Sequence, residues 1–363
     1  MTHFQPKMRI QTEVACPIYD SFRVRQVAGL FDLPLQAKVR ERFEVELPEA
    51  DESWRIGVIA GPSGSGKSTI ARQAYGEAVC RDFAWPADRA VIDCLGDRPI
   101  KEITHMLTAV GFSSPPAWIK PYAVLSTGQR FRCDLARALL DGGELVVFDE
   151  FTSVVDRTVA KIGSAAVARA VRATPSRRFV AVTCHHDVLE WLEPDWVLDM
   201  ATGTLDRRRL RRPGVKIEVV RCRHDAWRTF ASHHYLSGHL NKAARCYLAT
   251  WDGEPVAFCA LLAAIGRRGI WRISRIVVLP DYQGVGIGSR FCRAIAELYA
   301  EQGQRTTITT SHPAMVAYLR ASRHWRIRAV TKGGSSWRGF AARKSIRSTS
   351  GGRTVVSAEY SGT

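Results

Sequence analysis

A glycine-rich loop between an apolar strand and a helix is the feature that most constrains this chain. Residues 55–60 (RIGVIA) are expected to form a buried strand, 61–69 read GPSGSGKST, and 70–80 have a helical pattern. The loop fits GxxxxGK[ST], in which backbone N–H groups surround phosphates, the lysine reaches the outer phosphates and the hydroxyl binds Mg²⁺. A nucleotide site is therefore predicted, formed by Gly61, Ser63, Gly64, Gly66, Lys67, Ser68 and Thr69, with Ser68 also a metal ligand.

Further apolar runs predict a parallel α/β sheet around this loop. They lie at 43–48, 90–93, 144–149 and 178–184, and helical patterns separate the last three. The run at 144–149 ends in Asp149-Glu150. An acid at the end of a buried strand can orient the metal ion, and its neighbour can polarise an attacking water. We therefore assign Asp149 as a metal ligand and Glu150 as a catalytic residue.

Four motifs in a fixed order resemble those of ABC-type ATPases. After the loop come Leu125-Ser126-Thr127-Gly128-Gln129, similar to the signature LSGGQ, and residues 149–156 (DEFTSVVD), similar to DEPTSALD. The run 178–184 then leads to two histidines. The resemblance implies that Ser126, Gly128 and Gln129 bind ATP, that the protein forms a head-to-tail ATP-dependent homodimer in which Ser126 and Gly128 act in trans, and that His185, favoured over His186, contacts the γ-phosphate.

Two departures separate the chain from transporter ATPases. Gln73 is the only glutamine between the glycine loop and the signature, so no Q-loop is evident. Only 58 positions separate Lys67 from Leu125, which is short for a subunit that couples to a membrane partner. The chain is more similar to soluble ABC ATPases that act on nucleic acid or regulate a fused domain.

A second glycine pattern, Gln283-Gly284-Val285-Gly286-Ile287-Gly288, lies between an expected strand at 269–280 and a helix at 288–301. Glycines let the backbone approach an anion at a helix start. Alone the pattern is weak, but its context resembles the GNAT acyltransferase core. The resemblance implies an acyl-CoA substrate, acetyl-CoA or another, a strand splayed near Pro280, and Tyr318 as general acid, although Tyr318 can also be a packed aromatic. The residues assigned to acyl-CoA are Val278, Gln283, Gly284, Val285, Gly286, Gly288 and Ser289.

The expected fold class is α/β, a P-loop ABC-type ATPase domain over 1–212 followed by an α/β GNAT domain over 213–363. The charged run 206–214 is the linker candidate. Two clusters, His233-His234-Tyr235 and Ser311-His312-Pro313, also resemble Mom-type phage enzymes, a GNAT branch that modifies adenine in DNA. On that resemblance His234 and Tyr235 are catalytic candidates; no acidic residue stands out as a general base.

The charge of the chain is concentrated after residue 210. Residues 1–210 hold 27 basic and 27 acidic residues, whereas the remainder holds 25 against 8. Such an excess predicts a polyanionic partner such as nucleic acid. Nine scattered cysteines without CxxC favour reduced thiols. No signal-peptide pattern and no apolar run of about 18 residues is present, so we expect a cytoplasmic protein without a membrane partner.

Three functional hypotheses are compatible with these sequence features. The first is an ATP-gated, acyl-CoA-dependent N-acyltransferase that acts on nucleic acid. The second is a nucleic-acid-binding ATPase whose GNAT fold only binds. The third, a transporter ATPase subunit, is disfavoured by the short segment before the signature. The sequence names neither the acceptor nor the acyl group.

Overall fold

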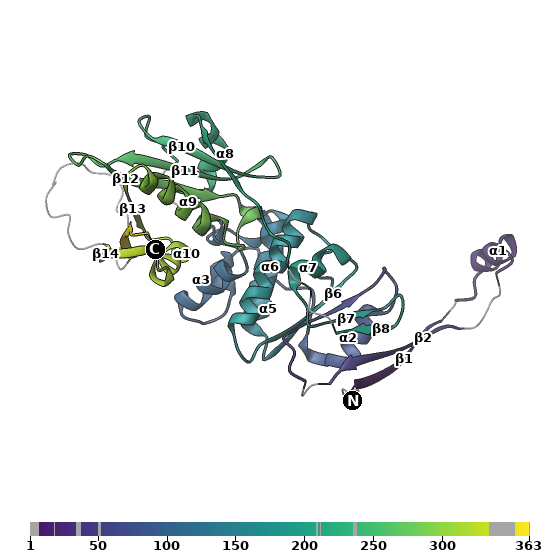
Figure 1. Cartoon of the computed structure of the whole chain (residues 1–363). Helices are drawn as coiled ribbons and strands as arrows, with labels where there is room; N and C mark the ends of the chain where they lie inside the picture. Colours follow the sequence, from purple (N-terminus) through teal and green to yellow (C-terminus); the bar gives the residue numbers. More distant parts are fainter. Residues whose placement is uncertain are drawn as a thin grey trace. The chain divides into compact units, whose positions relative to one another are not determined.

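A computed structural model of the chain describes residues 7–17, 19–33, 38–49, 52–207, 210, 212–234, 238–333 and 353–362. The chain divides into two compact units (Figure 1). The first comprises Met1–Phe83, Asp141–Ser153 and Val171–Arg212, and the second Ala84–Leu140, Val154–Ala170 and Pro213–Thr363. A border after Arg212 coincides with the expected domain boundary. However, residues 84–140 and 154–170 pack with the second unit, so the division into 1–212 and 213–363 stays a prediction.

The first unit contains a six-stranded sheet in the order β4-β5-β6-β3-β7-β8. All neighbours are parallel except β7 and β8. All five residues of β3 are buried, as expected for the middle of a parallel sheet. The strands are β3 (Ile56–Ala60), β4 (Val79–Cys80), β5 (Leu145–Phe148), β6 (Arg178–Thr183), β7 (Trp196–Asp199) and β8 (Thr204–Asp206).

A two-stranded antiparallel arm, β1 (Lys7–Pro17) with β2 (Lys38–Pro48), precedes this sheet. Its base contributes Ile10, Val45 and Leu47 to the core of the unit. Helix α1 (Phe22–Leu30) lies at the far end of the arm (Figure 1). Neither β1 nor α1 was expected from the sequence.

Two local predictions were wrong. Residues 90–93 were expected as a buried strand, but Ala90 makes only one isolated bridge, with Pro121, and Val91–Cys94 form a 3₁₀ helix in which the Asp93 N–H donates to the Ala90 carbonyl at 3.0 Å. The helix expected over 70–80 is α2 (Lys67–Tyr75). It stops at Gly76, whose φ of 52° lies in the left-handed region that favours glycine, and the chain then enters β4.

The second unit combines a helical region with a seven-stranded sheet in the order β14-β15-β13-β12-β11-β10-β9. Only β12 and β13 are parallel neighbours; the other pairs are antiparallel. The strands are β9 (Glu218–Cys222), β10 (Arg245–Trp251), β11 (Glu254–Ala263), β12 (Ile270–Val278), β13 (Arg305–Thr310), β14 (Trp325–Gly333) and β15 (Arg353–Tyr360).

The helices of this unit come from both parts of the sequence. The helices that precede Pro213 are α3 (Ile100–Ala109), α4 (Pro115–Trp118), α5 (Thr127–Asp141) and α6 (Arg157–Ala173). The last residues of α5 and of α6 fall in the first unit. The helices that follow Pro213 pack with the sheet and are α8 (Trp227–Phe230), α9 (Ile287–Glu301) and α10 (Pro313–Ala321). The short α7 (Leu189–Leu192) belongs to the first unit.

The mixed α/β class of both halves is as expected. Within the described residues, no helix combines the length and the apolar character that crossing a membrane requires. The cysteines whose side chains are described are all free thiols.

Candidate functional site

The glycine loop of the first unit connects the carboxyl end of β3 to the first turn of α2. Gly64 and Gly66 have φ values of 82° and 79°, so both positions favour glycine. Gly66 also lies under an aromatic ring, since a Cβ there would come within 2.7 Å of Phe43 Cζ. Lys67 Nζ donates to the Pro62 carbonyl at 2.6 Å, folding the side chain over its own loop. The loop and helix start thus have the backbone arrangement that can bind an anion, with an aromatic residue beside it.

The two predicted metal ligands lie together. Ser68 Oγ donates to Asp149 Oδ1 at 2.8 Å, and Asp149 is 3% exposed at the end of β5. A hydroxyl and a carboxylate oxygen are ligands that Mg²⁺ accepts, so the donors fit that ion. Glu150 is exposed beside them, with a φ of 53° that is uncommon outside glycine. Backbone strain of this kind is often found at functional sites.

An arginine that sequence reasoning missed lies between these two acids. Arg81 Nη1 is 3.5 Å from Asp149 Oδ2, and Nη2 donates to Glu150 Oε1. Arg81 directly follows β4, whose pairing with β5 brings it to the strand end that carries both carboxylates. The available sequence signal was a short apolar pair, Val79-Cys80, followed by an arginine. It lies between the glycine loop and the signature, in the region where no Q-loop glutamine is found.

The histidine pair follows β6. In the parallel pairing of β3 with β6, Ala60 lies opposite Thr183, so the chain leaves β6 beside the start of the glycine loop. There the Gly61 N–H donates to the Thr183 carbonyl at 3.3 Å. His185 is half-buried there, whereas His186 is exposed. Both stay candidates for the γ-phosphate contact, and the position at the strand end agrees better with His185.

The signature forms the amino-terminal cap of α5. Gln129 N–H donates to Ser126 Oγ at 3.3 Å, and Ser126 N–H donates to Gln129 Oε1 at 3.1 Å, which is a reciprocal capping box. Thr127, which replaces a glycine of the signature, is exposed. Gly128 is buried, and a Cβ there would lie 3.1 Å from Val159 Cγ1. The second glycine thus lies in a tightly packed position, whereas the first position accepts a side chain.

A buried arginine one turn into α5 joins the helical region to the seven-stranded part of the unit. The Arg132 side chain is 1% exposed; its Nη2 donates to the Asp281 carbonyl at 3.0 Å, and its Nη1 is 3.9 Å from Asp281 Oδ1. Burial lowers the pKa of Arg132 to about 10, and Asp281 opposes that shift. Asp281 lies two residues before the second glycine pattern, so the signature helix contacts the approach to that loop.

The seven-stranded sheet opens between β12 and β13. Their parallel pairing ends at Ile273 and Ile308, while each strand continues with another partner. In the β11–β12 register Ala260 pairs with Arg275 and Leu261 with Ile273, so Ser274 is the extra residue of a β-bulge. The splay therefore begins at this bulge and not at Pro280, which starts the following turn.

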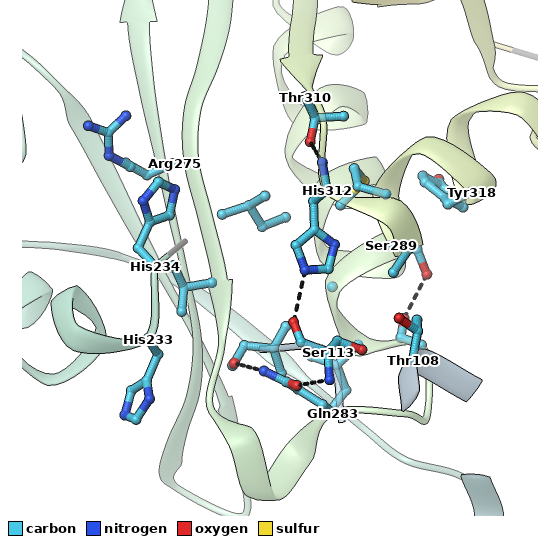
Figure 2. A pocket seen from close by; sticks show the side chains of 18 of the residues that line it. Thr108, Ser113, His233, His234, Arg275, Gln283, Ser289, Thr310, His312 and Tyr318 are labelled. Atoms are coloured by element: carbon cyan, nitrogen blue, oxygen red, sulfur yellow. Dashed lines mark hydrogen bonds between the residues drawn. The ribbon is translucent and has the colours of Figure 1, made fainter. Parts of the chain in front are cut away.

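A cavity of about 260 Å³ occupies this opening (Figure 2). Its walls are the diverging ends of β12 and β13, the glycine loop with the start of α9, one face of α10, and residues of α3, α4 and α6. The polar side chains that line it are Thr108, Ser113, Arg169, His233, His234, Ser274, Arg275, Tyr282, Gln283, Ser289, Thr309, Thr310, His312 and Tyr318.

The glycine loop of this unit resembles the glycine loop of the first unit in its backbone conformation. Gly284 and Gly286 have φ values of 103° and 86°, and Gly286 is the amino-terminal cap of α9. The first N–H groups of a helix have no partner within it and attract anions. Gly288 packs closely on the sheet, because a Cβ there would lie 3.1 Å from Val278 Cγ2.

Not every residue assigned to acyl-CoA faces the cavity. Val278, Gly284, Gly286, Gly288 and Ser289 line it, whereas Val285 is buried elsewhere. Both ends of the Gln283 amide make protein contacts: Nε2 donates to the Val278 carbonyl at 2.9 Å, and Oε1 accepts from Ser113 N–H at 2.8 Å. The side chain of Gln283 therefore shapes the loop.

The catalytic candidates that the structure describes lie around the same cavity. Tyr318 comes from α10, its hydroxyl accepts from Trp325 Nε1 at 3.2 Å, and burial raises its pKa. His234 is 7% exposed with its ring 5.8 Å from that of Trp227. Burial lowers the pKa of His233 below 6.5, so this residue is neutral at pH 7. Tyr235 lies outside the described residues.

Comparisons with known proteins match one region of the chain to a family model. Residues 208–322 match the model of the acetyltransferase (GNAT) family. No curated protein matches the chain in sequence. Similar solved structures include the IAA acetyltransferase of Bacillus cereus, with 18% identity over 40% of this chain and 99% of that one and a TM-score of 0.32. Another is the ATP-binding cassette MJ0796 in a dimeric post-hydrolysis state, with 17% identity over 47% and 93% and a TM-score of 0.37.

A third similar structure is a Bacillus subtilis acetyltransferase in complex with CoA, with 18% identity over 40% of this chain and 98% of that one and a TM-score of 0.31. Residues 208–322 of this chain thus match the acetyltransferase (GNAT) family model, and a glycine-rich P-loop pattern lies at residues 61–69 ahead of them.

Proposed function

We propose that the protein is an acyl-CoA-dependent N-acyltransferase fused to an ABC-type ATPase, and that it acts on nucleic acid. The observation that carries the transferase is the cavity between the splayed strands β12 and β13, with a glycine-capped helix at one end. A backbone anion site beside an apolar opening between strands suits a ligand with a diphosphate and an acyl-thioester arm.

The residues around the cavity can perform each proton transfer of the reaction. The acceptor nitrogen forms a bond to the acyl carbon, the carbon–sulfur bond breaks, and the thiolate takes a proton from the Tyr318 hydroxyl. An imidazole nitrogen of His233 or His234 accepts the proton that the acceptor nitrogen loses. Burial supports both roles, since it keeps the phenol protonated and His233 unprotonated at pH 7.

The ATPase half supports Mg²⁺-dependent ATP hydrolysis. Lys67 and the glycine loop would hold the phosphates, Ser68 and Asp149 would hold the ion, and Glu150 would orient the attacking water. Dimerisation through the signature, with Ser126 and Gly128 acting in trans, completes this part of the proposal.

Nucleic acid is the proposed acceptor because of charge. The 25 basic residues against 8 acidic ones after residue 210 would attract a polyphosphate backbone. Binding should weaken steeply with salt and depend little on base sequence. A shift assay with duplex DNA, single-stranded DNA and RNA tests the acceptor class; if none shifts at low salt in a sample that binds acyl-CoA, an amine of a protein or small molecule replaces nucleic acid.

Calorimetric titration of the full chain with acetyl-CoA tests the transferase. We expect binding by the wild type and its loss in Gly286→Glu, because a carboxylate at a left-handed residue beside the helix start fills and charges the anion site. Gly253→Glu, in the turn between β10 and β11 where nothing lies within 4 Å of an added Cβ, is the matched control. Binding without turnover would favour a non-catalytic GNAT fold, and equal binding by Gly286→Glu would reject the site.

A further inference from the structure

The helical region that carries the signature is built onto the glycine loop of the acyltransferase fold. Gly111 and Gly284 meet backbone to backbone: a Cβ on Gly111 would lie 2.7 Å from the Gln283 carbonyl oxygen, and one on Gly284 would lie 2.8 Å from Gly111 Cα. Neither position can accept a side chain without a shift of main chain. The loop between α3 and α4 therefore packs directly on the loop assigned to acyl-CoA.

The Ser113 backbone forms hydrogen bonds with two separate segments of the cavity wall (Figure 2). Its N–H donates to Gln283 Oε1 at 2.8 Å, and its carbonyl lies 2.8 Å from His312 Nε2. A carbonyl only accepts, so His312 donates from Nε2. Ser113 thereby connects the glycine loop with the segment between β13 and α10, and both belong to the cavity wall.

Helix α6 brings a cation to the same loop. Arg169 lines the cavity, is exposed, and its guanidinium donates to the Gly284 carbonyl. One turn earlier, Ala166 is buried against Gly284, whose added Cβ would come within 2.9 Å of Ala166 Cβ. This close packing fixes α6 against the loop and places Arg169 at the start of α9, where N–H groups already attract anions.

We propose that Arg169 is a phosphate-binding residue of the acyl-CoA site, which makes the site composite: the acyltransferase fold supplies the glycine loop, and helix α6, ahead of it in sequence, supplies the cation. The inference rests on the proposed binding of acyl-CoA and names the ligand groups involved, the diphosphate or the 3′-phosphate. A guanidinium suits both, because its planar fork donates two parallel hydrogen bonds to phosphate oxygens.

Calorimetric titration of the full chain with CoA tests this assignment. Arg169→Gln should weaken CoA binding about tenfold, the usual effect of losing one hydrogen bond between charged groups. Arg169→Lys keeps the charge and should show an intermediate affinity. Arg268→Gln, an exposed arginine in the turn between β11 and β12 that does not line the cavity, should bind CoA as the wild type does.

A salt series separates phosphate binding from a packing role. If Arg169 pairs with phosphate, the affinity ratio between wild type and Arg169→Gln shrinks as NaCl rises, since salt screens the lost attraction. A ratio that stays constant with salt, or equal CoA affinities in the two proteins, overturns the assignment. Dephospho-CoA then locates the contact: the Arg169→Gln effect persists with it for a diphosphate contact and disappears for a 3′-phosphate contact. If the wild type itself does not bind CoA, the proposed transferase function fails, and this inference with it.

Discussion

The buried pair of Arg132 and Asp281 allows a quantitative test of how the signature helix is attached to the acyltransferase fold. Asp281→Asn is the perturbation. It keeps the size of the side chain and the main-chain carbonyl that Arg132 Nη2 contacts, and it removes only the negative charge. The guanidinium, 1% exposed, then loses the stronger of the two carboxylate attractions that act on it and keeps only the weaker attraction of Asp156.

The expected loss of stability follows from the distance between the two charged groups and from the solvent exposure of Asp281. Two unit charges at the 3.9 Å separation of these atoms attract by ~4 kcal/mol at an effective dielectric of about 20 and by ~1 kcal/mol in water. Because the Asp281 side chain is 52% exposed, solvent screens the pair and the value should lie near the lower limit. We expect Asp281→Asn to destabilise the second unit by ~1–2 kcal/mol.

Scanning calorimetry of the full chain measures this effect. For a unit of this size, 1 kcal/mol lowers Tm by ~2–4 °C, so a loss of ~1–2 kcal/mol should lower Tm by ~2–8 °C. Arg132→Met completes a double-mutant cycle, because it removes the buried charge and leaves Asp281 partly solvated. In the Arg132→Met background, Asp281→Asn should change Tm by less than about 1 °C, as expected for an uncoupled surface substitution.

An equal decrease in both backgrounds would refute the reasoning, because it would show that Asp281 acts through contacts other than Arg132. An unchanged Tm in the wild-type background would show that solvent screens the pair completely, and that the helical region is held by backbone packing such as that of Gly111 on Gly284.

Three further results are expected. Burial raises the pKa of Asp134 from 3.8 to about 6, so the stability that its protonated form contributes is present below about pH 4 and is lost as the pH rises through 6. The difference in Tm between the wild type and Asp134→Asn should therefore change by several degrees between these pH values and stay constant at higher pH. Arg81→Gln should lower the Mg²⁺ concentration needed for binding of a fluorescent ATP analogue, since the cation no longer competes for Asp149; an unchanged Mg²⁺ midpoint would contradict this. Glu150→Gln should retain ATP, lose turnover and dimerise in ATP, and light scattering that shows an ATP-bound monomer would exclude the trans signature.

Local patterns sufficed where a segment makes its own contacts. The glycine loop before α2 needs left-handed residues at Gly64 and Gly66 and a buried strand before it, and each requirement is visible in a few consecutive residues. The glycine loop before α9 is recognisable for the same reason. The strand ending in Asp149 could also be identified, because a buried strand and its acidic end are local features.

Partners distant in sequence could not be predicted. Gln283 fits the pattern of a cofactor loop, yet its amide contacts Ser113, 170 residues away. Residues 90–93 are apolar enough for a strand, but the chain offers Ala90 a single bridge partner, Pro121, and the next residues close a 3₁₀ turn instead of extending a ladder. In both cases the outcome depends on which distant segment lies beside the residue.

By itself, the sequence of this protein determined the α/β class, the two glycine-rich loops that precede helices, the order of the motifs that resemble those of ABC-type ATPases, and the uneven distribution of charge. Only the tertiary structure showed that Arg81 lies between Asp149 and Glu150, that the sheet opens at the Ser274 bulge, and that the segment carrying Ser113 and Arg169 packs on the second glycine loop. The physical reason is that a loop or a capped helix is specified by the torsion angles and hydrogen bonds of neighbouring residues. A composite cavity, in contrast, depends on the packing of helices and strands far apart in the chain, which no short pattern encodes.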